Sequence, residues 1–109
     1  MRDIIFGGTG HDIIEAHRGD NIVYGNEGDD YISANSNTTP FGTSNNKLMG
    51  GQGNDYIGIR GNATTSLNDI HGGEGDDYIE GGNGADDLYG DSGNDVIYGR
   101  NGDDELFGG

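Results

Sequence analysis

The sequence contains no cysteine and few basic residues, and each shortage excludes a class of structure or partner. Without cysteine, no disulfide can stabilise the chain and no thiolate can bind a metal. Lys and Arg number 5 against 20 Asp and Glu, and the formal net charge of −15 excludes direct binding to nucleic-acid phosphates. No run of 18 apolar residues is present, so no membrane-spanning helix is expected. The opening MRDIIFGGTGHD lacks the apolar stretch of a signal peptide.

Large apolar side chains are also scarce. Leu, Ile, Val and Phe together supply 20 of the 109 residues, whereas Gly alone supplies 24 and Pro occurs once. A composition this acidic and this poor in apolar residues is typical of disordered chains. The length fits one domain, predicted over residues 1–109. If that domain folds, something besides a hydrophobic core must offset its charge.

Glycine and aspartate recur with a period of nine residues, and this periodicity argues against disorder. The clearest copies of the unit span 7–15, 50–58, 72–80 and 81–89, and the period is interrupted by predicted insertions at 34–40 and 59–62. Position six of every unit is Asp or Asn: Asp3, Asp12, Asn21, Asp30, Asn46, Asp55, Asn68, Asp77, Asp86, Asp95 and Asp104. Position eight is always aliphatic: Ile5, Ile14, Val23, Ile32, Leu48, Ile57, Ile70, Ile79, Leu88, Ile97 and Leu106.

The unit resembles GGxGxDxUx, the calcium-binding nonapeptide of the RTX (repeats-in-toxin) family. The resemblance implies an all-β fold, a right-handed parallel β-roll of about 5–6 two-unit coils. It also implies that positions one to six form a turn and positions seven to nine a short strand. Calcium would lie between loops stacked on the same edge, held by position-six carboxylates and loop carbonyl oxygens.

The residue types support this interpretation independently. Calcium binds six to eight oxygens at about 2.3–2.6 Å, from carboxylates and carbonyls together. Glycine accepts a positive φ and can turn loop carbonyls toward one point. The candidate glycines are Gly8, Gly10, Gly28, Gly51, Gly53, Gly73, Gly75, Gly82, Gly84 and Gly93. Stacked carboxylates repel one another without a cation, so calcium binding and folding should be linked.

In a two-unit coil, alternate loops fall on opposite edges. The regular edge comprises the loops 7–12, 25–30, 50–55, 72–77 and 90–95, with Asp12, Asp30, Asp55, Asp77 and Asp95 at position six. Its five loops leave four gaps, which predicts about four calcium ions. The second edge comprises the loops that end at Asp3, Asn21, Asn46, Asn68, Asp86 and Asp104, and both insertions lie on it. Asn provides no charge, so calcium should bind more weakly at Asn21 and its neighbours, and the Asp86–Asp104 pair is the one full site expected there.

The remaining positions predict the core and the outer faces. Only position eight should point inward, which gives about two aliphatic side chains per coil. Aromatic side chains at positions seven and nine should stack along the sheets, or else form an adhesive face for a partner. The long loops of the second edge carry the sequons at Asn37 and Asn62 and represent either tolerated drift or a recognition surface.

The expected function is a non-enzymatic calcium-binding module of an extracellular protein. No Ser/His/Asp arrangement, phosphate loop or EF-hand pattern is present. By resemblance, such proteins leave bacteria by type I secretion and fold on meeting calcium. The alternatives are a subunit that stacks head to tail into a filament and, less favoured, an ice-binding or glycan-binding repeat.

Overall fold

The computed structural model describes residues 2–35, 44–61 and 63–109, and these contain strands and turns but no helix. One set of strands is β1 (Ile4–Thr9), β3 (Ile22–Glu27), β5 (Lys47–Gln52), β7 (Asp69–Glu74), β9 (Asp87–Ser92) and β11 (Glu105–Phe107). The other set is β2 (Ile13–Ala16), β4 (Tyr31–Asn35), β6 (Tyr56–Arg60), β8 (Tyr78–Glu80) and β10 (Val96–Tyr98).

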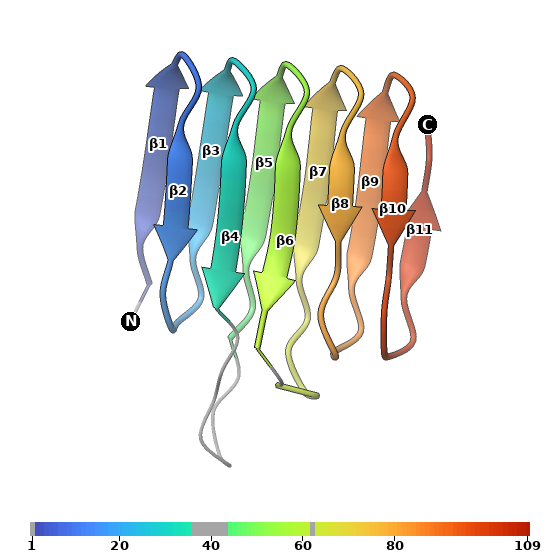
Figure 1. The fold of residues 1–109 in the computed structure, drawn as a ribbon. Coiled ribbons are helices and arrows are strands. Elements are labelled where there is room, and N and C mark those ends of the chain that lie inside the picture. Colours follow the sequence, from blue (N-terminus) through green and yellow to red (C-terminus); the bar gives the residue numbers. More distant parts are fainter. Residues whose placement is uncertain (1, 36–43, 62) are drawn as a thin grey trace.

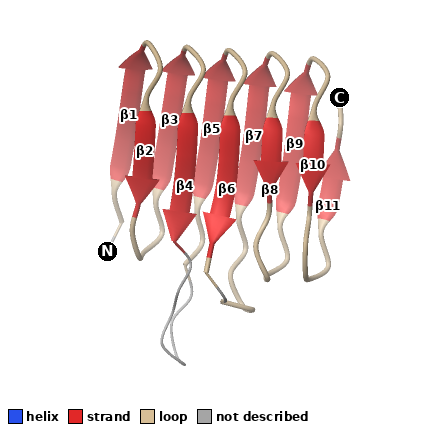
Figure 2. Ribbon diagram, in the orientation of Figure 1, coloured by secondary structure: helices blue, strands red, loops and turns tan. Residues whose placement is uncertain are grey.

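The two sets form two parallel sheets, with the orders β1-β3-β5-β7-β9-β11 and β2-β4-β6-β8-β10. In Figure 1 the chain runs up each odd-numbered strand at the back and down the next even-numbered strand in front while advancing to the right, which is a right-handed coil. Figure 2 shows that the described parts of the connections between the sheets are loops at the two edges. The predicted parallel β-roll is therefore confirmed, with about five turns.

Strand pairing follows the nine-residue alignment position by position. In one sheet Val23 pairs with Leu48, and in the other Ile32 pairs with Ile57. The position-eight residues Ile14, Val23, Ile32, Leu48, Ile57, Ile70, Ile79 and Leu88 are all buried, and Ile5 and Ile97 pack against them from the ends. The molecule is only 13 Å thick along its shortest axis, so this core is a single layer of side chains.

The core also contains residues that the sequence analysis left out. Ala16, Ala34 and Ile59 are buried and pair with one another in the sheet of even-numbered strands. Ala34 and Ile59 are the first residues of the two predicted insertions, yet both continue strands, followed by Asn35 paired with Arg60. The departure from the period therefore begins after these strand ends. Asn37 and Asn62 lie outside the described residues.

Aromatic side chains stack along both outer faces, as the sequence analysis expected. Tyr56 lies between Tyr31 and Tyr78, with ring centroids 4.9 and 5.1 Å apart and nearly parallel planes. On the other face Tyr89 lies between His71 and Phe107 at 4.4 and 4.8 Å. The 18-residue coil thus places equivalent rings one strand spacing apart.

Candidate metal-binding edge

The regular edge lies at the top of Figure 1, where each odd-numbered strand turns into the next even-numbered one. The strands β1, β3, β5, β7 and β9 extend through positions one to three, so Asn26 pairs with both Gly8 and Gly51. Beyond this pairing, the Gly28 N–H donates a 2.8 Å hydrogen bond to the Gln52 carbonyl oxygen. The six-residue turn implied by the resemblance is thus wrong for this edge, because hydrogen bonds between coils keep the first half of each loop extended.

The aspartates at position six form a continuous hydrogen-bonded column. Each backbone N–H donates to the Oδ1 atom of the aspartate one coil further on, at 2.8–2.9 Å, along Asp12, Asp30, Asp55, Asp77 and Asp95. These bonds fix one oxygen of each acceptor carboxylate and direct the side chain into the loop. Asp30, Asp55 and Asp77 are almost completely buried.

The second carboxylate oxygen of this column has no partner. The Oδ2 atoms of Asp12, Asp30, Asp55, Asp77 and Asp95 are buried and accept no hydrogen bond within the described part of the chain. Each lies above position one of its own loop: a Cβ on Gly50 would meet Asp55 Oδ2 at 2.2 Å, and one on Gly72 would meet Asp77 Oδ2 at 2.3 Å. A buried carboxylate oxygen without a donor is costly, and a cation would relieve that cost.

The glycines at positions two and four provide carbonyl oxygens beside these carboxylates. Gly8, Gly10, Gly28, Gly51, Gly53, Gly73, Gly75 and Gly93 all have φ between 105 and 129°. The carbonyl oxygen of Gly28 lies 2.2 Å from where a Cβ of Gly53 would be, and that of Gly53 lies 2.0 Å from the Cβ position of Gly75. Carbonyl groups therefore point along the stack into the space between coils, and a side chain there would block them.

Backbone oxygens must supply most of the ligands in such a site. In the described ranges no three acidic or histidine side chains converge as a metal site made of side chains alone would require. Calcium accepts mixed sets of carboxylate and carbonyl oxygens. The unpartnered Oδ2 atoms and the glycine carbonyls of neighbouring loops are such a set.

The electrostatics of the column also favour a cation. Burial raises the pKa of Asp55 to about 6, and the charges of Asp77 and Asp30 add to the increase against the lowering effect of its hydrogen bond with Asp30. Burial likewise raises the pKa of Asp77 to about 6, with Asp95 the largest charge contribution. The metal-free column thus holds carboxylates that resist ionisation.

The middle of the second edge has the same backbone column, but its described asparagine side chains have no buried oxygen without a partner. The Asn21 N–H donates to Asn46 Oδ1 at 3.2 Å, and the Asn46 N–H donates to Asn68 Oδ1 at 3.1 Å. The amide NH₂ groups fill the remaining position: Asn21 Nδ2 donates to the His17 carbonyl oxygen at 2.7 Å, and Asn46 Nδ2 to that of Ser44 at 3.2 Å. An amide donor therefore engages the loop carbonyls here.

Two serines complete this arrangement. Ser44 and Ser66 stand at position four and are fully buried. Ser44 Oγ accepts from the Gly19 N–H at 3.0 Å and donates to the Gly19 carbonyl oxygen at 2.8 Å, and Ser66 Oγ accepts from the Ser44 N–H at 3.1 Å. The signal in the sequence was serine in place of glycine at position four in two of the three units that carry asparagine at position six.

The loop that ends at Asp86 differs from the regular loops despite its matching motif. Gly82 and Gly84 lack the positive φ of their equivalents on the regular edge. Asp86 Oδ1 accepts from Asn68 Nδ2 at 2.7 Å, and Asp86 Oδ2 accepts from the Gly82 N–H at 2.7 Å. A Cβ on Gly82 would lie 3.0 Å from Ile59, so this loop is packed against the preceding coil.

The outer loops of the second edge keep parts of the regular arrangement. In the loop that ends at Asp104, Arg100 and Gly102 have φ of 72 and 121°, and the Asp86 N–H donates to Asp104 Oδ1 at 3.0 Å. Asp3 is exposed and donates its N–H to Asn21 Oδ1 at 3.1 Å. The structure thus brings the predicted aspartates into two columns, of which only the regular edge combines unpartnered oxygens with open carbonyls throughout.

Comparison with protein families yields one match, which covers most of the chain. Four copies of the RTX calcium-binding nonapeptide repeat match residues 2–36, 42–57, 63–97 and 81–109. Neither the curated proteins nor the solved structures gave a significant match. Among the described residues, no helix is long and apolar enough to span a membrane.

Proposed function

Since the chain belongs to the family of RTX calcium-binding nonapeptide repeat proteins, we propose that it is a non-enzymatic module that folds on binding calcium outside the cell. The observation that carries this proposal is the column of five buried Oδ2 atoms without partners on the regular edge. About four ions, one in each gap between the five loops, would give each of these oxygens a cation.

Charge repulsion within the column and the small core link the ions to folding. Each neighbouring pair of carboxylates repels by roughly 3.5 kcal/mol at strand spacing and an effective dielectric near 20. The single-layer core offers little apolar area to offset this repulsion together with the lost chain entropy. An ion that binds only the stacked loops adds its binding free energy to folding.

The expected calcium affinity supports an extracellular location. Extracellular calcium modules bind with Kd of about 10⁻⁴–10⁻³ M, a range that suits loops assembled largely from backbone carbonyls. We propose that the chain is unfolded where calcium is scarce and becomes ordered on reaching calcium outside the cell. Type I secretion, which the family resemblance implies, would deliver such an unfolded chain.

The decisive experiment is a calcium titration followed by far-UV circular dichroism, with EGTA reversal. The spectrum should change from disordered to β with calcium and return on chelation. Asp55 borders two gaps between loops, so Asp55→Ala should raise the calcium concentration at the midpoint several-fold. Asn46→Ala should leave the midpoint of the regular edge much closer to that of the wild type. A chain fully folded in EGTA, or equal midpoint shifts in both variants, would contradict the proposal.

We further propose that the middle of the second edge closes without metal. The amide groups of Asn21 and Asn46 engage the loop carbonyls that would otherwise face an ion. Binding of calcium between these loops would require breaking those hydrogen bonds, and no carboxylate compensates. We therefore do not propose Asn21 as a calcium ligand, whereas a calcium site between Asp86 and Asp104 remains a prediction.

End-to-end self-association is the second candidate function, favoured by the apolar strands at both ends of the stack. Ile13 is 80% exposed in β2, and Leu106 is 50% exposed in β11. The outer strands also carry unpaired backbone groups, which readily pair with another chain. Light scattering and electron microscopy in calcium test this candidate: filaments that Ile13→Lys suppresses would support it, and discrete particles at all protein concentrations would exclude it.

A further inference from the structure

The regular edge carries a second column of side chains at position five, directly before the aspartates. Its members are His11, Asp29, Asn54, Asp76 and Asn94, and all of them are exposed. The Asn54 N–H donates to Asp29 Oδ1 at 2.8 Å, and the Asp76 N–H donates to Asn54 Oδ1 at 2.9 Å. The Asp29 N–H donates to His11 Nδ1, and the Asn94 N–H to Asp76 Oδ1, both at 2.9 Å. One bond of this kind therefore spans each gap between the five loops.

The hydrogen bonds of the two columns run in opposite directions. In the position-six column, the Asp30 N–H donates forward to Asp55 Oδ1 at 2.8 Å. In the position-five column, the Asn54 N–H donates back to Asp29 Oδ1 across the same gap. Each gap is therefore closed by a reciprocal pair of hydrogen bonds, with one donor from each of the two loops that border it.

Asn54 is bonded on both sides and so joins two neighbouring gaps. Its N–H holds the loop 50–55 against the preceding loop, and its Oδ1 atom holds the following loop. A calcium ion that orders one gap would thus keep the shared loop in the geometry that the next gap requires. An element shared in this way is a physical route for coupling between two binding sites.

The members of the position-five column share a hydrogen-bond acceptor and not a charge. Asp29 and Asp76 alternate with Asn54 and Asn94, so the bonds between loops do not require a carboxylate. These side chains are also open to water, and a hydrogen bond that water can replace adds little net stability. Position five is therefore suited to positioning one loop against the next.

On the second edge the same column begins and then stops. The Asn45 N–H donates to Asp20 Oδ1, and the Leu67 N–H donates to Asn45 Oδ1, both at 2.9 Å. The next two position-five residues are Leu67 and Ala85, whose side chains contain no acceptor. The reciprocal pair of hydrogen bonds cannot form across the gaps that follow these two residues.

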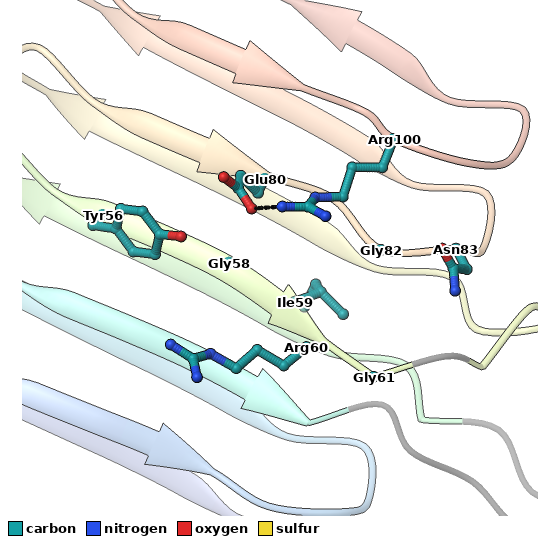
Figure 3. A pocket seen from close by; sticks show the side chains of 9 residues that line it. All are labelled: Tyr56, Gly58, Ile59, Arg60, Gly61, Glu80, Gly82, Asn83 and Arg100. Carbon is teal, nitrogen blue, oxygen red and sulfur yellow. Dashed lines mark hydrogen bonds and ion pairs between the residues drawn. The ribbon is translucent and has the colours of Figure 1, made fainter.

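The loop 81–86 lies between those two gaps and lacks the conformation of the regular loops. Gly82 and Gly84 do not have the positive φ of their equivalents. Figure 3 shows Gly82 beside Ile59, which belongs to the preceding coil. Loss of the position-five bond thus coincides with loss of the regular loop conformation, although the motif of this unit is intact.

We propose that the position-five side chains make calcium binding cooperative by coupling each gap of the regular edge to the next. This inference rests on the proposed calcium function. Four gaps that act as one unit limit the Hill coefficient to about four, whereas two separate pairs of gaps would limit it to about two. Asn54 stands between the second and the third gap, so its side chain links the two pairs.

Calcium titrations of Asn54→Ala by circular dichroism and isothermal titration calorimetry test the proposal. The substitution removes the acceptor of the Asp76 N–H but no charge. We expect as many bound ions as in the wild type, with a Hill coefficient lowered toward about two. Asn54→Asp keeps an acceptor like that of Asp29 and should restore the wild-type steepness. Unchanged steepness in Asn54→Ala, or equal loss in Asn54→Asp, would overturn the proposal.

Two controls separate coupling from general destabilisation. Asn94→Ala makes the same change in the last of the five loops, where the side chain spans no gap, and should titrate like the wild type. Ile57→Val weakens the core of the same coil and should raise the calcium midpoint at unchanged steepness. Equal loss of steepness in Asn54→Ala and in either control would overturn the coupling role.

The wild-type titration distinguishes failure of this inference from failure of the proposed function. A wild-type chain that gains no structure with calcium would overturn both. A wild-type chain that folds on binding calcium, beside an Asn54→Ala variant of equal steepness, would overturn the coupling alone. The circular dichroism spectrum at saturating calcium confirms that each variant reaches the folded state.

Discussion

Asp55 and Asn46 occupy the same position of adjacent units. Their side chains differ in a single group, because Asn46 has an amide Nδ2 where Asp55 has a carboxylate Oδ2. Both accept a backbone hydrogen bond through Oδ1. The second atom of Asn46 donates to the Ser44 carbonyl oxygen and to Asn68, whereas that of Asp55 is buried without a donor. One side chain thus closes its loop without metal, and the other leaves a place that a cation can fill.

This comparison predicts the effect of Asp55→Asn. The amide should take the role seen on the second edge, so the calcium-free protein should gain about 1–3 kcal/mol in free energy of unfolding. The variant should also bind less calcium. Urea unfolding in EGTA, with a stabilising osmolyte if the folded population is small, measures the first effect. A calcium-free variant less stable than the wild type would contradict it.

The raised pKa values predict the pH dependence of the metal-free protein. Asp55 and Asp77 have a pKa of about 6 in the folded chain, against a usual value of 3.8. Between these two values the folded state binds more protons than the unfolded state. Protonation of the two carboxyl groups therefore stabilises the folded state fully below pH 4, and this stabilisation is lost as pH rises through 6. In metal-depleted buffer, acidification from pH 7 to 4.5 should increase the free energy of unfolding by about 1–3 kcal/mol. The β-structure seen by circular dichroism should increase accordingly. A smaller response in Asp55→Asn is the control, and loss of structure on acidification would refute the assignment.

At the scale of the element, the conformation of a calcium-binding loop depends on the neighbouring coils as well as on its own nonapeptide. Units 81–89 and 72–80 match the motif equally well, yet only the second has the positive φ values at its glycines. The loop 81–86 rests on Ile59 and bonds to Asn68, while the loop 72–77 rests on another regular loop. A motif therefore adopts the calcium geometry when its neighbour has that geometry too.

Substitution of the glycine at position four tests whether the geometry of one loop depends on the neighbouring loop. Gly53 has φ of 125°, and its Cβ would lie 2.2 Å from the Gly28 carbonyl oxygen. Gly53→Ala should therefore destabilise the calcium-loaded protein by about 2–4 kcal/mol and raise the calcium midpoint. Gly58→Ala, on the same coil but without a positive φ, should change the stability by no more than about 0.5 kcal/mol. Thermal unfolding in calcium compares the two, and equal losses would argue against a special role of position four.

For the whole molecule, the sequence predicts well which residues stack in columns. It predicts less well which hydrogen bonds those residues form. The period of nine predicted the position-eight core and both position-six columns, because a solenoid repeats the same contacts in every coil. The nine-residue period places Ala34 and Ile59 in loop insertions, because both depart from the glycine motif. In the structure both are buried, because their strands continue through them. The metal-free closure by Ser44 and Asn46 depends on hydrogen bonds between coils, which no single unit reveals.

The stack also predicts how calcium sites depend on position. Asp12 stands in the first loop of the regular edge and borders one gap, whereas Asp55 borders two. Asp12→Asn should therefore remove about one of about four bound ions and Asp55→Asn about two. Equilibrium dialysis with radioactive calcium measures the number bound. An equal loss in the two variants would mean that the ions do not lie between the loops.

The single-layer core makes chain length an easily varied property of this fold. Each position-eight side chain packs against its neighbours within one thin layer, so no residue deep inside has to adapt when a coil is added. Duplication or loss of 18 residues would keep every column in phase. A change of nine residues would instead exchange the two edges and place asparagines in the aspartate column. Duplication or deletion of two units together is thus tolerated, whereas that of a single unit is not. Natural variants should therefore differ in length by whole coils.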